Sequence, residues 1–142
     1  MNFYYLVILL VGQIMWATHS PSAFSQNVIQ TFSDQLQAEG YKIEKIVCSA
    51  IPEKSSLIYN YHFSPIKSYK ILAFSENTEV NDVDLFVENN LGNTIIADKH
   101  YHSSAALVFK PQESAEYVLS ALLYSCLSDI RRYSCVIIIA SK

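Results

Sequence analysis

Two aspartates separated by one residue, Asp82 and Asp84, are the first candidates for chemistry in this sequence. Oxygen donors crowd the nine residues that end with them: Glu76, Asn77, Glu79, Asn81, Asp82 and Asp84. Calcium takes roughly six to eight such oxygens, so Glu79, Asp82 and Asp84 are candidate calcium ligands. The segment has no glycine and does not match the EF-hand loop. The alternative is a hydrated loop whose carboxylates accept backbone N–H bonds.

Catalysis by this carboxylate pair is disfavoured by its surroundings. A general acid needs a desolvated carboxyl group with a raised pKa, whereas Asp82 and Asp84 stand among Asn, Glu and Thr residues. The chain also lacks the G-x-S-x-G and H-E-x-x-H motifs of serine and zinc hydrolases. We therefore expect no enzyme activity, and a hydrolase site assembled from distant loops is the alternative.

A second set of candidate ligands consists of Asp98, His100 and His102. These residues alternate, so a continued strand would turn all three to one side. Two imidazoles and a carboxylate can hold zinc. The alternative is an exposed polar turn, KHYHSS, whose histidines titrate near neutral pH without partners.

The three cysteines are Cys48, Cys126 and Cys135. Cys126 and Cys135 flank a polar stretch, LSDIRRYS, and a hairpin there would bring them together. In an oxidising compartment we expect them to form a disulfide, which would stabilise the fold by roughly 2–3 kcal/mol. Cys48 is left over. No His or basic residue adjoins it, so we expect a buried, unreactive thiol.

The first 25 residues carry no charge, and Phe3 to Ala17 is apolar except for Gly12 and Gln13. This pattern predicts a signal peptide, cleaved after Ser25, because the apolar run is shorter than the roughly 20 residues of a membrane span. The segment lacks the usual Lys or Arg, so an uncleaved anchor is the alternative. Either reading places the rest of the chain in the periplasm or outside the cell.

The remaining segment, residues 26–142, is long enough for one domain with a core. It carries all 13 acidic and 10 basic residues, a net charge of −3. This balance gives no attractive field for nucleic acid or anionic lipid. We therefore expect neither nucleic-acid binding nor membrane attachment after signal cleavage.

Residues 26–40 are predicted to form an amphipathic helix. Val28, Ile29, Phe32 and Leu36 recur at helical spacing, with Ser25 suited to its start and Gly40 to its end. An exposed pro-segment is the alternative.

Residues 41–142 change to a period of two. Short runs rich in β-branched and aromatic residues alternate with polar connections, which predicts an antiparallel β-sandwich or barrel. The expected strands are Tyr41–Ile51, Leu57–Phe63, Ser68–Phe74, Val83–Val87, Asn93–Ala97, Ala105–Phe109, Glu116–Leu123 and Tyr133–Ala140. The last is apolar on both faces, so we expect a central strand on which the helix packs.

Strand alternation predicts where the aspartates lie. Val83, Leu85 and Val87 should face the core, and the opposite, hydrated side should carry Asp82, Asp84, Phe86 and Glu88. The stretch ENNLGN should form a hairpin in which Gly92 takes positive φ.

Two rows of side chains could make a binding surface: Tyr59, Tyr61 and Phe63 share one strand face, as do Tyr69, Ile71 and Ala73. Exposed aromatic rings stack on sugars or dock proteins. The alternative is that these rows form the inner face of a sheet.

In chain order, SYKILAF, DVDLFV, a Gly-Asn turn, IIAD and LVFKPQESAEYVL resemble the pre-peptidase C-terminal (PPC-like) domain family, with its pattern D-x-D-L-x-V, a Gly-containing turn and F-x-P-x-x-S-G-x-Y. The resemblance runs from about Leu57 to the C-terminus. The matching positions are Asp82, Asp84, Leu85, Val87, Gly92, Asn93, Asp98, Phe109, Pro111, Ser114 and Tyr117.

The resemblance implies an extracytoplasmic, jelly-roll-like β-sandwich without catalytic machinery of its own, often accompanying secreted enzymes. Some domains of this family bind calcium, and the cysteines near the end are similar to those of small stand-alone exported relatives. Two departures stand out. Ala115 replaces the usual Gly, and KHYHSS replaces a more acidic loop.

Together these patterns predict a mainly β protein with residues 1–25 as signal peptide, 26–40 as an N-terminal amphipathic helix and 41–142 as a PPC-like, jelly-roll-like antiparallel β-sandwich. We expect a non-catalytic exported module that binds an unknown protein or glycan partner. The alternatives are a calcium-stabilised structural domain and an unrecognised hydrolase. Apart from possible calcium, we expect no cofactor.

Overall fold

The computed structural model describes residues 26–126 and 132–142, which form one helix and eight strands. The predicted signal peptide and the predicted Ser25 cap lie outside the described residues. Every expected strand is confirmed, with ends that shift by a few residues. The elements are α2 (Gln26–Ala38), β1 (Lys42–Ile51), β2 (Ser56–Phe63), β3 (Tyr69–Phe74), β4 (Val80–Glu88), β5 (Thr94–Asp98), β6 (Ser104–Phe109), β7 (Ala115–Cys126) and β8 (Tyr133–Ser141).

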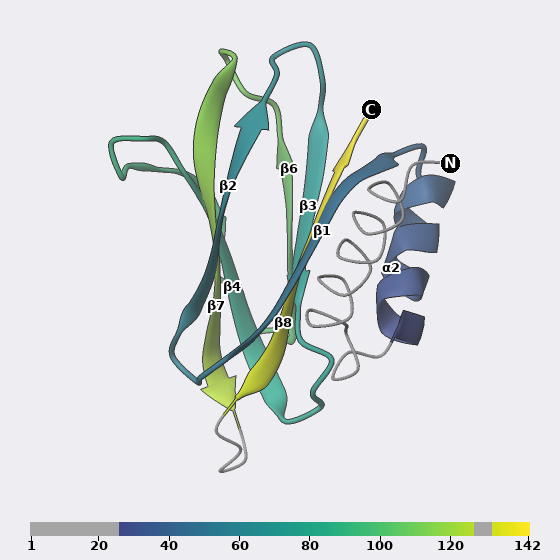
Figure 1. The fold of residues 1–142 in the computed structure, drawn as a ribbon, viewed down its shortest axis with the longest axis vertical. Coiled ribbons are helices and arrows are strands. Elements are labelled where there is room, and N and C mark those ends of the chain that lie inside the picture. Colours follow the sequence, from purple (N-terminus) through teal and green to yellow (C-terminus); the bar gives the residue numbers. More distant parts are fainter. Residues whose placement is uncertain (1–25, 127–131) are drawn as a thin grey trace, which may run out of the picture.

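The strands form two four-stranded antiparallel sheets that pack face to face (Figure 1). One sheet has the order β1-β8-β3-β6 and the other β2-β7-β4-β5. The pairs β1/β8, β2/β7, β3/β6 and β4/β5 each join strands whose numbers sum to nine, which is the arrangement of an eight-stranded jelly roll. The expected mainly β fold, an antiparallel β-sandwich preceded by one N-terminal amphipathic helix, is confirmed.

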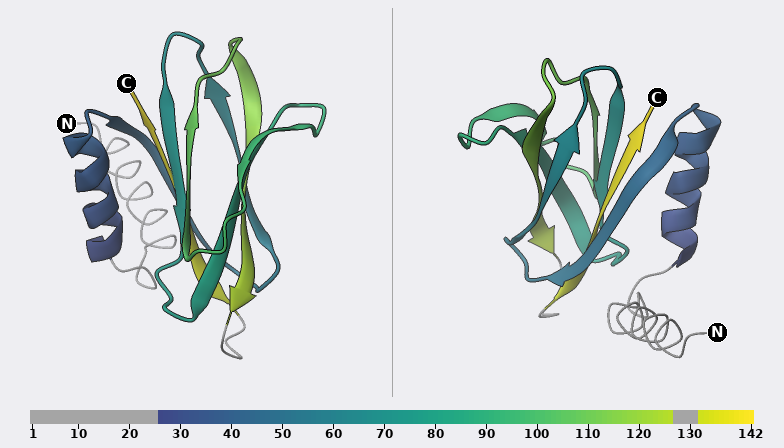
Figure 2. Two further views of the ribbon diagram at one scale, coloured as in Figure 1. Left: turned by 180° about the vertical axis from the view of Figure 1, so that it is seen from behind. Right: turned by 45° about the horizontal axis from the view of Figure 1, so that its top comes forward.

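The helix α2 packs on the outer side of the sheet β1-β8-β3-β6, here named the helix-side sheet (Figures 1 and 2). The other sheet is named the open sheet, because no helix of the described residues covers its outer side. Within the part of the chain that the structure describes, no helix is long and apolar enough to cross a membrane.

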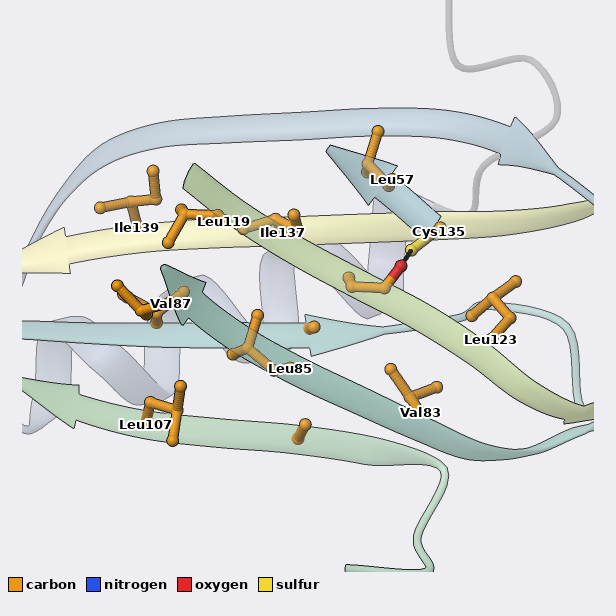
Figure 3. Close-up of a cluster of buried hydrophobic side chains, with 14 of the residues drawn as sticks. Leu57, Val83, Leu85, Val87, Leu107, Leu119, Leu123, Cys135, Ile137 and Ile139 are labelled. Atoms are coloured by element: carbon orange, nitrogen blue, oxygen red, sulfur yellow. Dashed lines mark hydrogen bonds between the residues drawn. The ribbon is translucent and has the colours of Figure 1, made fainter. Parts of the chain in front are cut away.

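The core between the sheets follows the predicted alternation. Val83, Leu85 and Val87 are fully buried, as predicted, and they face Ile137 and Ile139 of the other sheet (Figure 3). Burying apolar surface between two layers stabilises the fold by roughly 25 cal/mol for each Å² removed from water.

All nine residues of β8 are buried, as its two apolar faces predict. One face joins the core, while Val136 and Ile138 on the other contact the cluster that includes Leu36 of α2. The helix ends as expected at Gly40, whose φ of 87° suits glycine. The N–H groups of Gly40 and Tyr41 donate to the carbonyls of Gln37 and Leu36, at 3.0 and 2.9 Å, and so complete a Schellman cap.

The connection between β4 and β5 is the predicted hairpin. Gly92 has a φ of 80°, and the side-chain oxygen of Asn89 accepts bonds from the N–H groups of Leu91 and Asn93, at 3.0 and 2.9 Å. Among the described non-glycine residues only Lys54 has positive φ. Ala115, which replaces the usual glycine, therefore does not have positive φ, and it begins β7 without backbone strain.

The predicted hairpin between β7 and β8 is wrong, and the predicted disulfide between Cys126 and Cys135 is not shown by the structure. β7 pairs with β2 and β4 in the open sheet, whereas β8 pairs with β1 and β3 in the helix-side sheet. The connection thus crosses from one sheet to the other. Cys135 is a free, buried thiol that donates to the carbonyl oxygen of Ala121, 4.0 Å away (Figure 3).

Candidate functional site

The outer face of the open sheet is left uncovered by the helix. Successive side chains of a strand point to opposite sides, so the residues between the buried core positions point outward. This face carries apolar side chains, and Ile58 and Tyr124 remain 63% and 56% exposed. The apolar residues are Ile58 of β2, Phe86 of β4, Ala97 of β5, and Val118, Leu122 and Tyr124 of β7.

Strand pairing arranges these residues in rows. Ile58 lies opposite Ser120, Ser120 opposite Phe86, and Phe86 opposite Ala97, so one row crosses all four strands.

Acidic residues lie on both sides of that row. Asp84 is paired with Leu122, and Glu88 is paired with Val118. Sequence analysis missed this surface, although the alternation in β2 and β4 already contained the signal, because it singled out aromatic rows instead.

Asp82 is buried, with 7% of its surface exposed, so the prediction that it is hydrated is wrong. Irregularities in the pairing of β4 with β7 on either side of Asp82 break the alternation, and both Asp82 and Val83 are buried. Within the described residues, the Oδ1 atom of Asp82 has no hydrogen-bond partner. A buried, unpaired carboxylate oxygen is costly, so we expect Asp82 to lower the stability of the fold.

Asp84 is half-buried beside Asp82. Burial raises the pKa of Asp84, repulsion from Asp82 and Asp98 adds to the effect, and Lys99 opposes it. Within the described residues, no three His, Cys, Asp or Glu side chains are placed to hold a metal ion. The structure thus places Asp82 near Asp84 without gathering Glu79 into a set with them, and calcium binding by Glu79, Asp82 and Asp84 stays a prediction.

Asp98 is engaged by the backbone rather than left open to a ligand. Its Oδ2 accepts the N–H of Ala106 at 3.0 Å, and its Oδ1 accepts the N–H and the ring nitrogen Nδ1 of His100 at 3.1 and 2.8 Å. His102 instead contacts Ser104 through Nδ1, at 3.3 Å. Both histidines are exposed, as in the alternative of a polar turn, but both have hydrogen-bond partners.

The two rows considered for ligand stacking belong largely to the core. Phe63 and Tyr69 are buried with ring centroids 4.6 Å apart, and Phe63 also meets Phe109 edge-on at 5.3 Å. Tyr59 and Tyr61 are partly buried and pack against the same cluster. The interpretation as an inner sheet face is confirmed, and these rings form no exposed row.

The thiols of Cys48 and Cys135 are unreactive at neutral pH. Burial and the charge of Glu76 raise the pKa of Cys48 to about 11, and burial raises the pKa of Cys135 to about 12. Both therefore stay protonated at neutral pH, and the thiolate is the reactive form. They also belong to different faces of the helix-side sheet, because Cys135 lies in the core and Cys48 packs under α2.

A groove of about 200 Å³ lies between α2 and the helix-side sheet. Its lining is mainly apolar and includes Phe32, Leu36, Leu72 and Phe74, with Lys70 as a charged member. Lys70 is already paired with Glu39 at 2.5 Å. Another residue of the lining, Ala106, donates its N–H to Asp98 at 3.0 Å. Asp84 lies in the other sheet.

No protein-family model matches this sequence, and no curated protein matches it. The fold is similar to that of the pre-peptidase C-terminal domain of a collagenase from Bacillus anthracis, at 13% identity over 68% of this chain and 89% of that chain, with a TM-score of 0.46. It is also similar to PliG from Aeromonas hydrophila, a periplasmic inhibitor of g-type lysozyme (6% identity, 73% and 90% coverage, TM-score 0.45).

A third similar structure is a chain from the disulfide-linked pili of Bacillus endospore appendages, at 14% identity over 70% of this chain and 88% of that chain, with a TM-score of 0.41. These likenesses concern the fold alone. In class, the protein is a jelly-roll β-sandwich with one helix-covered and one open outer face.

Proposed function

We propose that this chain is a non-catalytic, exported binding module that engages a protein partner through the outer face of its open sheet. The observation that carries the proposal is the contrast between the two outer faces. On the helix-side sheet, α2 covers apolar side chains such as Ile138 and Leu72. On the open sheet, Ile58 and Tyr124 remain largely exposed beside Phe86 and Leu122.

A protein suits this face better than a glycan. Sugars are bound by exposed aromatic rings, and the strand row with the most rings is partly or fully buried through Tyr59, Tyr61 and Phe63. The open sheet instead offers mainly aliphatic side chains, with the single rings of Phe86 and Tyr124 among them, between acidic ones. Mixed apolar and polar surfaces of this kind are typical of protein interfaces, in which apolar residues at the centre are shielded from water by a polar rim.

The absence of catalysis in this proposal rests on the state of the titratable groups. Cys48 and Cys135 are held as thiols, and Asp98 is occupied by Ala106 and His100. The carboxylates Asp82 and Asp84 lie in the open sheet, whereas the groove beside α2 is lined by residues of the helix and the helix-side sheet. A general acid or base needs to reach a bound substrate.

A calcium-stabilised structural domain is the second candidate, and Asp82 is the observation that favours it. Its buried Oδ1 lacks a hydrogen-bond partner within the described residues, and its charge raises the pKa of Asp84. A bound cation would relieve both costs. Asp82 and Asp84 would be the ligands, and the other oxygens of a calcium site would have to come from neighbouring groups.

Capture of partners with the tagged, exported chain tests the proposal. Ile58→Asp places a charge in the apolar row of the open sheet. Val108→Asp is the matched control, because Val108 is a β-branched residue, 58% exposed, on the edge strand β6 of the other sheet. We expect Ile58→Asp to lose a partner that the wild type and Val108→Asp retain. Identical capture by all three proteins would refute the proposal.

A further inference from the structure

We propose that the partner of the open sheet is a basic protein surface, in which Lys or Arg side chains alternate with apolar ones. This inference rests on the proposed function and adds the chemistry of the partner.

Charge is distributed unevenly between the two sheets. The four strands of the open sheet contain no Lys or Arg, and their acidic residues are Asp82, Asp84, Glu88, Asp98 and Glu116. The helix-side sheet contains Lys42 and Lys45 in β1 and Lys70 in β3. The open sheet is therefore the acidic side of the molecule, although the whole chain has a net charge of only −3.

Three of these acids belong to the outer face. Asp84 and Glu88 are half-buried on either side of Phe86 in β4, and Glu116 is exposed in β7 opposite His62. Asp84 and Glu88 are four residues apart, so about 13 Å separates them along the strand. A partner that complements this strand needs two cations at that spacing with an apolar side chain between them.

No cation of the described residues neutralises these acids. The ion pairs there join Lys67 to Glu44, Lys70 to Glu39 and His100 to Asp98. Glu116 is near the Asn60 amide, at 3.3 Å, which leaves its charge in place. Within the described residues, Lys99, just beyond β5, is the cation that lowers the pKa of Asp84. Its attraction is outweighed, because burial and the neighbouring carboxylates still raise the pKa of Asp84.

The same charges argue against other occupants of the face. A second copy of this chain would bring Asp84, Glu88 and Glu116 against an equally acidic surface, and like charges across an interface suppress association. Nucleic acid and anionic lipid are repelled for the same reason. A partner with cations is attracted, and its approach is accelerated at low salt.

Peptide probes test the charge requirement directly. A peptide of repeated Lys-Thr-Val-Thr places Lys and Val alternately on one side of an extended strand, with lysines about 13 Å apart. Its counterpart carries Glu in place of Lys. Calorimetry with the purified exported chain should show at least roughly tenfold tighter binding of the basic peptide, weakened as salt rises from low to physiological levels. Equal binding of both peptides, or no binding of either, overturns the inference.

Charge reversal separates this inference from the proposed function. Glu88→Lys and Glu116→Lys should each weaken binding of the basic peptide and of the captured partner about threefold or more. Asp34→Lys makes the same charge change at an exposed position of α2 and should leave both affinities unchanged. If both Glu variants capture the partner normally and Ile58→Asp does not, the face is a docking site but its partner is not basic. If Ile58→Asp also captures normally, the proposed function itself fails.

Discussion

Replacing Asp98 by alanine tests whether this residue, which matches a motif position of PPC-like domains, holds the fold together. Asp98 ends β5 in the open sheet, while Ala106 lies in β6, an edge strand of the helix-side sheet. The bond from the Ala106 N–H to Oδ2, at 3.0 Å, therefore ties the two sheets together. Two further bonds from His100, at 2.8 and 3.1 Å, shape the connection between these strands.

The size of the effect follows from the exposure of each partner. A hydrogen bond to a charged group contributes about 1.5–3 kcal/mol net. The His100 side chain is 94% exposed, so its ion pair with Asp98 contributes less than about 1 kcal/mol. Water can replace part of the bond to the exposed edge at Ala106. We expect Asp98→Ala to lower the free energy of unfolding by about 2–3 kcal/mol at neutral pH.

The loss should depend on pH. Burial alone would raise the pKa of Asp98, but the hydrogen bonds from Ala106 and His100 outweigh it and hold the pKa below its ordinary value. A carboxylate with a lowered pKa stabilises the fold fully above its unfolded pKa of about 3.9, and that contribution is lost as pH falls through the folded pKa. The difference in stability between the wild type and Asp98→Ala should therefore shrink as the pH falls below about 4.

Urea unfolding followed by far-UV circular dichroism at pH 7 and pH 3 measures both quantities. Asp34→Ala is the control, because Asp34 is exposed on α2 and accepts one bond from Gln30, at 2.7 Å; its loss should cost less than about 0.5 kcal/mol. If Asp98→Ala lowers the free energy of unfolding no more than the control does, or lowers it equally at pH 3, the hydrogen bonds to Asp98 do not stabilise the fold as described.

Four further predictions concern other parts of the chain. Leu36→Ala, under the helix at 1% exposure, should cost about 2–5 kcal/mol in urea unfolding, and a smaller loss would mean that α2 is weakly docked. Lys54→Gly should raise stability by about 0.5–1 kcal/mol in the same assay, because Lys54 has a φ of 58°. Cys48 and Cys135, with pKa values of about 11 and 12, should react with a thiol reagent at neutral pH only as fast as the protein opens; rapid labelling of the folded protein would contradict this. If calcium binds at Asp82, excess calcium should raise the melting temperature by roughly 5 °C over EDTA, and Asp82→Asn should abolish the rise; equal melting temperatures of the wild type would remove the calcium candidate.

The strands could be predicted because their burial alternates along the chain. Val83, Leu85 and Val87 are buried as the period of two requires. Both faces of β8 are apolar, which predicted its central place and its contact with the helix, and Gly40 marked where the helix ends. These features are local, so the sequence alone carries them.

The sheet order and the bulges could not be predicted in the same way. A polar stretch such as LSDIRRYS serves equally well as a hairpin turn or as a crossing between sheets, and only the packing of all eight strands decides between them. This is why the predicted hairpin between β7 and β8 failed. The burial of Asp82 was missed because the irregular pairing beside it depends on β7, a strand far away in the sequence.

The two outer faces differ in how their apolar residues are kept from causing aggregation. A sandwich has two outer sides, and apolar residues on either would promote aggregation if left bare. The helix-side sheet buries its residues under α2, through Phe32 and Leu36. The open sheet keeps its apolar row exposed but borders it with Asp84 and Glu88, which repel other copies of the same face. These acids would be unnecessary for solubility if a second helix covered the row. Their presence beside it is the reason to expect that the cover is supplied by another protein of opposite charge.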